Sequence, residues 1–209
     1  MEDVLEVYHR PYHEARPLVC LDETTKQLVG EVRNPLPLRP GDPAAQDTHY
    51  KRNGVATLFM MTAPLEGFRE VRVTEGKTRI DYAQCLQWLA TEKYPHAEKI
   101  VLVQDQLNTH HPCSLYEAFA PDKARELISR FEFHYTPKHG SWLNIAEIEL
   151  SVLARQCLDR RIADASKLIS EIAAWCQYRN QYLKQINWQM TTQDARIKLK
   201  KLYPSYNVA

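Results

Sequence analysis

Two nearly uninterrupted apolar runs, each followed by an aspartate, constrain the fold of this chain most strongly. The first run, 18–21, ends at Asp22, and the second, 100–104, ends at Asp105. Strands that are apolar at successive positions suit a sheet covered on both faces, whereas half-exposed strands alternate. The two runs therefore predict central strands of a helix-covered sheet, with an acidic side chain at the end of each.

The remaining periodicity predicts a mixture of strands and helices. Strands are expected over 18–22, 27–32 (as the hairpin partner of the first), 55–63, 68–74, 99–105 and 131–135. Helices are expected over 79–93, 121–130, 143–158 and 163–183, with a last short helix capped by Thr192. This order indicates an α/β domain with a mixed β-sheet flanked by helices, and it is compatible with the ribonuclease-H-like architecture.

The domain organisation follows from the polar and proline-rich segments. Residues 1–17 are polar and contain two prolines, so they are expected to form a linker or arm. The core of the domain is expected over 18–160, and 161–209 should supply C-terminal helices of the same domain. Within the core, 33–53 holds four prolines, which exclude a regular helix or a central strand. A loop of this length is usually functional, so 33–53 is predicted to protrude as an arm.

Composition narrows the classes of protein. The 209 residues carry a net charge of only +1, so any DNA contact must come from local basic clusters rather than from the whole surface. The five cysteines are odd in number and show no CxxC spacing, which favours reduced thiols in a cytoplasmic protein. No apolar run is long enough to span a membrane.

A third acid, Glu147, is singled out by helical phase. If Leu143 is placed at zero and each residue turns by about 100°, Glu147 falls in the same arc as the apolar residues of 143–158, and Glu149 falls outside it. The phase predicts a buried Glu147 that is paired or binds a metal, and a solvated Glu149. A structural ion pair at Glu147 is an open alternative, and either aspartate alone could be a turn residue or helix cap.

Three carboxylates in these contexts suit hard divalent cations, which prefer oxygen ligands. A pair of such ions can stabilise both the attacking and the leaving oxygen of a phosphodiester. The acids therefore predict a metal-dependent enzyme that acts on a nucleic-acid backbone.

Longer strings carry a family resemblance. They are Asp22-Glu23, QDQLNTH at 104–110, HYTPKHGSWLNIAE at 134–147 and DARIKLKKLYP at 194–204. Over essentially the whole chain the sequence resembles the mariner-related bacterial insertion-sequence transposases (the insertion-sequence-630 group) of the DDE superfamily. The resemblance implies a ribonuclease-H-like core in which Asp22, Asp105 and Glu147 hold two Mg²⁺ or Mn²⁺ ions. It also implies a magnesium-dependent transposase and endonuclease in cut-and-paste transposition, whose partners are element ends, target DNA and a second subunit clamped by 33–53.

Two departures from the family and several secondary residues complete the predictions. Gln106 stands where the family usually has Asn, and no helix-turn-helix segment precedes residue 17, so a catalytic domain alone is expected. The candidate DNA contacts are Lys138, His139, Asn108, His110, Trp142 and Arg33. For these, the alternatives are a solvated loop charge, a structural histidine and a core tryptophan. The competing functions are a non-catalytic DNA-binding or dimerisation module, and a structure-selective nuclease on the same fold.

Overall fold

A computed structural model describes residues 1–33, 39–41, 47–138, 140–182 and 184–203. Its centre is a five-stranded sheet in the order β3-β2-β1-β4-β5. The strands are β1 (Leu18–Glu31), β2 (Tyr50–Ala63), β3 (Phe68–Thr74), β4 (Ile100–Gln104) and β5 (Phe131–Tyr135). The first three strands pair in antiparallel fashion, while β4 lies parallel to β1 and β5 parallel to β4. The prediction of an α/β fold with a mixed sheet is confirmed.

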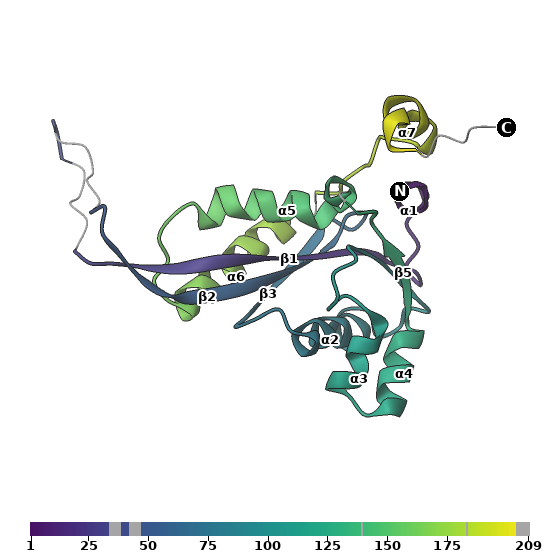
Figure 1. The fold of residues 1–209 in the computed structure, drawn as a ribbon, viewed down its shortest axis with the longest axis horizontal. Coiled ribbons are helices and arrows are strands. Elements are labelled where there is room, and N and C mark those ends of the chain that lie inside the picture. The colour runs from purple at the N-terminus through teal and green to yellow at the C-terminus, as the bar shows by residue number, and fades with distance from the viewer. Residues whose placement is uncertain (34–38, 42–46, 139, 183, 204–209) are drawn as a thin grey trace.

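Helices cover both faces of the sheet (Figure 1). They are α1 (Glu2–Tyr8), α2 (Arg79–Trp88), α3 (Leu115–Ala118), α4 (Pro121–Ser129), α5 (Ile145–Leu153), α6 (Ala165–Gln181) and α7 (Thr192–Lys198). Two of them continue as π-helical turns, α2 into Leu89–Lys93 and α5 into Ala154–Leu158. Short 3₁₀ turns lie at Pro112–Ser114, Ser141–Leu143 and Lys200–Leu202. None of the described helices is long and apolar enough to cross a membrane.

Strand β1 supplies both halves of the core, as its apolar run predicts. Leu18 and Cys20 belong to the cluster that α1, α5 and α6 complete. Val19 and Leu21 belong to the cluster on the other face, with α2 and α4. Successive side chains of a strand point to opposite faces, so a strand covered on both sides must be apolar at every position.

The prediction of a polar linker over 1–17 is wrong for residues 2–8. This segment forms α1, whose side chains Val4, Leu5, Val7 and Tyr8 are buried in the core. The Tyr8 hydroxyl also donates a hydrogen bond of 2.6 Å to the backbone oxygen of Leu143. Figure 1 shows α1 and α7 at the same end of the molecule. The amino-terminal segment therefore belongs to the folded domain.

The β1–β2 hairpin is longer than the sequence indicates. The expected strands 18–22 and 27–32 are one strand, and its partner β2 begins at Tyr50, inside the segment expected to be irregular. The register shifts between Gln27 and Val29, and Gly54 takes a φ of +114°, which favours glycine. The far end of the ribbon runs out from the body of the domain (Figure 1). The predicted protruding arm is thus flanked by extensions of β1 and β2. Residues 34–38 and 42–46 lie outside the described residues.

The predicted cap of the last helix is displaced by one residue. Thr191, rather than Thr192, caps α7, because its hydroxyl accepts from the backbone of Asp194 while the Asp194 carboxylate accepts from the backbone of Thr191. This reciprocal capping box satisfies two backbone donors that a helix start would otherwise leave open.

Candidate active site

Parallel pairing of β1 with β4 brings two of the three acids together. Cys20 lies opposite Val103 in the last matched pair of these strands. Two residues further along each chain are Asp22, within β1, and Asp105, directly after β4. Asp22 is buried, whereas the Asp105 side chain is 40% exposed. The predicted convergence of the two strand-associated aspartates therefore follows from the register of the sheet.

Asn144 fastens the start of α5 to the strand that carries Asp22. Its side-chain nitrogen donates hydrogen bonds of 2.9 Å to the Leu21 backbone oxygen and to Asp22 Oδ2. Its side-chain oxygen caps α5 by accepting from the backbone N–H of Ala146. Because a cap fixes where a helix begins, Asn144 also fixes the place of Glu147 in the first turn. This positioning role was not predicted from the sequence.

The electrostatics of Asp22 show that the three acids influence one another. The pKa of Asp22 is raised to about 7, first by burial and then by the negative charges of Glu147, Asp105 and Glu23, against the effect of a hydrogen bond from the Glu23 backbone. Like charges disfavour ionisation only when they are close. The prediction that repulsion among the acids raises at least one pKa is confirmed.

A buried histidine holds Asp105 from the other side. His110 Nδ1 lies 2.5 Å from Asp105 Oδ1, and its Nε2 lies 3.0 Å from Glu23 Oε2. Burial opposes the charged imidazole, but the hydrogen bond to Asp105 and the negative charges of Asp105 and Glu23 outweigh it and raise the pKa of His110 to about 9. For Asp105, burial raises the pKa, but the bond and charge of His110 outweigh it and leave that pKa lowered.

His110 therefore orients Asp105 and is too deeply buried to serve as the predicted DNA contact. The buried partner Glu23 was not predicted as a site residue. Its adjacency to Asp22 in the sequence is the one signal that could have suggested it.

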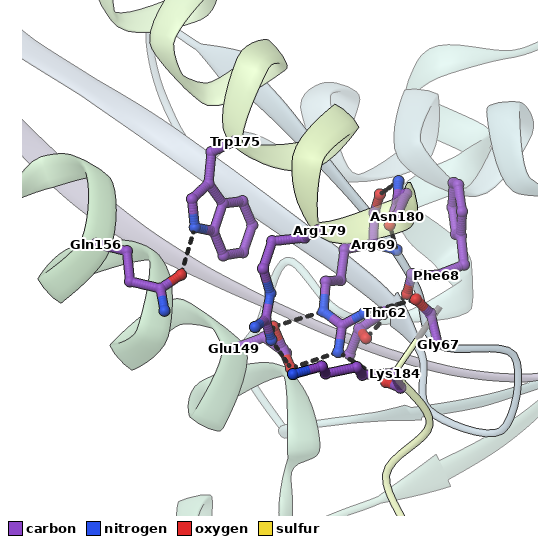
Figure 2. A network of polar contacts seen from close by, with 10 residues as sticks. All are labelled: Thr62, Gly67, Phe68, Arg69, Glu149, Gln156, Trp175, Arg179, Asn180 and Lys184. Carbon is purple, nitrogen blue, oxygen red and sulfur yellow. Dashed lines mark hydrogen bonds and ion pairs between the residues drawn. The ribbon is translucent and has the colours of Figure 1, made fainter. Parts of the chain in front are cut away.

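The helix-phase prediction for the two glutamates of α5 is wrong. Glu147 is exposed, and Glu149 is the buried residue. Figure 2 shows Glu149 between two arginines: Arg69 donates from Nε at 2.7 Å and from Nη2 at 2.9 Å, and Arg179 Nη2 lies at 3.3 Å. Glu149 thus forms a structural ion pair with the arginines, and it is not part of the site that holds the two aspartates.

The error has a physical cause. Leu143, which set the phase, lies in a 3₁₀ turn ahead of α5, and Leu158 lies in the π-helical turn after it. Neither position continues the 100° progression of an α-helix. Within α5 proper the buried side chains are Ile145, Ala146, Glu149, Leu150 and Leu153. Glu147 points away from that face, and its charge nevertheless acts on Asp22.

The remaining candidates lie in different settings. Lys138 is exposed and lines a groove of about 400 Å³ together with Asp105. Asn108 is exposed and lines a neighbouring cavity of about 520 Å³ with Gln106. Trp142 is exposed, so the alternative of a core tryptophan is wrong.

The other two candidates are Arg33 and His139. Arg33 stands at the start of the arm, 3.6 Å from Asp47. His139 lies outside the described residues. Gln106, which replaces the usual Asn, donates to the Thr136 backbone oxygen at 3.3 Å. Orientation of Asp105 consequently falls to His110 and to the Leu107 backbone N–H, which donates to Asp105 Oδ1 at 3.1 Å.

The donor chemistry of the site fits a hard divalent cation. Asp22, Asp105 and Glu147 offer carboxylate oxygens, and Asp22 forms no ion pair with any described residue. A cation would remove the repulsion that raises the pKa of Asp22. Within the described ranges, however, no three His, Cys, Asp or Glu side chains already surround a common point closely enough to hold an ion.

Solved structures of a transposase share the fold. The Mos1 mariner paired-end complex with Mn gives a TM-score of 0.57 at 16% identity, covering 87% of this chain and 54% of that one. The Mos1 strand transfer complex gives 0.55 at 16% identity, covering 87% and 55%. The mariner Mos1 paired-end complex with Mg gives 0.55 at 17% identity, covering 88% and 56%. The likeness confirms the predicted ribonuclease-H-like architecture.

Two further comparisons concern sequence and length. The chain spans little more than half the length of these Mos1 chains. Among curated proteins none matches it significantly. Residues 17–169, which include β1, β4, α5 and all three acids, match the sequence profile of the DDE superfamily endonucleases. The chain therefore belongs to the DDE superfamily endonucleases.

Proposed function

We propose that this chain is the catalytic domain of a mariner-related transposase, which cleaves DNA strands and joins a 3′-hydroxyl end to target DNA. The observation that carries the proposal is the register of β1 and β4, which brings Asp22 and Asp105 together, with Glu147 in the first turn of the helix whose cap, Asn144, bonds to Asp22. Membership of the DDE endonuclease family and the fold shared with Mos1 strand transfer and paired-end complexes support it.

Asp22, Asp105 and Glu147 are proposed as the metal ligands, with Mg²⁺ or Mn²⁺ as the ions. Two bound ions would activate the attacking oxygen and stabilise the leaving 3′-oxygen. The protein's part is orientation: Asn144 holds Asp22, and His110 holds Asp105. Lys138, in the same groove as Asp105, is proposed to bind a phosphate beside the scissile bond.

The β1–β2 arm is proposed to clamp a second copy of the chain on DNA. Val32, Tyr50 and Val55 on its described part are exposed, although their side chains are largely apolar. Arg33, and Lys51 and Arg52 in β2, add positive charge there. Exposed apolar groups flanked by cations suit a protein partner bound close to phosphates. We also place the protein in the cytoplasm, since all five cysteines are free thiols.

Metal-dependent nicking of supercoiled plasmid tests the proposal. Wild-type protein should nick in Mg²⁺ or Mn²⁺ and stop when the metal is chelated. Asp22→Asn, Asp105→Asn and Glu147→Gln should each lower the rate by about 100-fold or more, because each removes a proposed ligand of the metal ions that would stabilise the charge of the transition state. Glu126→Gln is the matched control, since Glu126 is an exposed carboxylate on α4.

Two further readouts separate the competing functions. Joining of a labelled 3′-hydroxyl end to plasmid identifies a transposase, whereas nicking alone identifies a nuclease. Calorimetric titration with Mn²⁺ should show weaker binding by Asp105→Asn than by the control. DNA binding without any metal-dependent nicking, and unchanged Mn²⁺ affinity in Asp105→Asn, would refute the catalytic assignment and leave a DNA-binding module.

A further inference from the structure

A second groove lies on the α6 side of α5. It has a volume of about 360 Å³ and is lined by Gln156, Tyr178, Arg179, Tyr182 and Lys184. Figure 2 shows two of these side chains, Gln156 beside Trp175 and Arg179 beside Glu149. Glu149 faces α6 through Arg179, whereas the charge of Glu147 acts on Asp22. The groove is therefore distinct from the acidic site, although one helix borders both.

Two exposed tyrosines dominate the groove. Tyr178 is 59% exposed and Tyr182 is 58% exposed, one helical turn apart on α6 and its end. Their ring centroids are 5.2 Å apart and the ring planes meet at 67°. In such an edge-to-face pair, each ring keeps a face open to a further planar group. Packing of the domain does not require these rings, since most of their surface lies in solvent.

The polar floor of the groove carries surplus positive charge. Arg69 and Arg179 share one carboxylate, that of Glu149, so the buried cluster keeps one uncompensated positive charge. Lys184 is exposed, and no described acidic side chain forms an ion pair with it. Cations beside open aromatic faces are the combination that binds single-stranded nucleic acid: phosphates meet the cations, and bases stack on the rings.

The groove is within reach of a strand leaving the acidic site. Gln156 lies nine positions after Glu147, on α5 and the π-helical turn that continues it, which is at most about 14 Å at 1.5 Å per residue. About four nucleotides of a DNA strand cover that distance at 3.4 Å each.

We propose that the groove between α5 and α6 binds single-stranded DNA, with unpaired bases stacked on Tyr178 and Tyr182 and phosphates held by Lys184 and Arg179. The identity of the ligand as DNA rests on the proposed function. In this arrangement the groove guides the unpaired strand as it leaves the cleavage site. Duplex DNA gains nothing from it, because paired bases present no free face to the rings.

Metal-free binding measurements test the proposal without depending on cleavage. Fluorescence anisotropy of a labelled oligothymidine should show an affinity lower by about fivefold or more for Tyr178→Ala and for Tyr182→Ala. Tyr178→Phe and Tyr182→Phe keep the ring and should bind nearly as wild type. Tyr116→Ala removes a similarly exposed tyrosine on α3 and should change nothing. Affinity for a duplex should be the same in all variants.

Photocross-linking provides a second test of the proposal. An oligonucleotide with iododeoxyuridine should cross-link to peptides containing Tyr178 or Tyr182. Unaltered oligothymidine binding by both alanine variants would overturn the proposal, as would equal losses for duplex and single strand. The urea midpoints of the variants should match wild type, since the rings are mostly exposed. Loss of metal-dependent nicking would sink the catalytic proposal while leaving this binding result intact, so the two failures are distinguishable.

Discussion

Replacing Glu149 by Gln should destabilise the fold severely, because this buried carboxylate is the ion-pair partner of two guanidinium groups. The Arg69 side chain is 1% exposed and that of Glu149 is 3% exposed. Arg69 donates two hydrogen bonds to the carboxylate, at 2.7 Å and 2.9 Å, and Arg179 approaches to 3.3 Å. Glutamine preserves the volume but removes the charge. Leaving buried charges without their partner costs about 3–5 kcal/mol.

The loss can be measured in two ways. Urea denaturation followed by tryptophan fluorescence gives the free energy of unfolding directly, and Trp175, which bonds to Gln156 beside the cluster, reports on the region. For a chain of this size each 1 kcal/mol shifts the Tm by about 2–4 °C, so the Tm should fall by about 6–20 °C. Glu147→Gln, two residues away and exposed, should change the stability by less than about 0.5 kcal/mol.

The double variant Arg69→Met with Glu149→Met is the informative companion. Replacing a buried ion pair by apolar side chains of similar volume is often neutral or stabilising. It should therefore recover part of the loss that Glu149→Gln causes, although Arg179 and the Gly67 and Lys184 backbone oxygens lose a partner. A loss below about 1 kcal/mol for Glu149→Gln would refute the reasoning, since it would mean that water reaches the arginines in solution.

Three further predictions concern other parts of the chain. Asn144→Ala should cost about 1–2 kcal/mol in urea denaturation, since it removes a helix cap and the bond to Asp22; unchanged stability would contradict its positioning role. Burial raises the pKa of Glu132, but bonds led by Arg10 outweigh it and lower that pKa to about 2. The resulting stability is complete above about pH 4.5 and is lost as the pH falls toward 2, so Glu132→Gln should flatten the acid limb of a Tm-versus-pH curve; an unchanged limb would count against the ion pairs. Cys113 is the one exposed thiol of five, so one equivalent of a thiol reagent should react rapidly with native protein and five with unfolded protein; two fast thiols would contradict the described burial.

The shorter strands of the sheet could be predicted from the sequence, whereas the 14-residue strands β1 and β2 were predicted only in part. The strand expected over 131–135 coincides with β5, and that over 68–74 with β3. By contrast, α1 has only seven residues, too few to establish a helical period, and its stability comes from packing. Its four buried side chains could not be recognised without the surfaces that cover them.

The candidate site shows the same division between local and long-range information. Asp22 and Asp105 were identified from local strings, and the register of β1 and β4 brings them together. The burial of Glu149 depends on Arg69, which lies 80 positions away in the sequence. The contact between His110 and Glu23 likewise joins the loop after β4 to β1, which no local pattern connects. Such partners, distant in the sequence, decide which of two neighbouring acids is buried.

The long β1–β2 ribbon has a consequence for local stability. A two-stranded ribbon alone is marginally stable in water, yet the segment between α5 and α6 braces this one along its length. Lys26 donates to the Leu158 backbone oxygen, the Val29 backbone donates to Ile162, and Asn53 donates to Ala163. These hydrogen bonds from the segment between α5 and α6 therefore stabilise the arm, although that segment is remote from the arm's tip. Loosening of the segment between α5 and α6 should therefore speed amide hydrogen exchange in the arm as well.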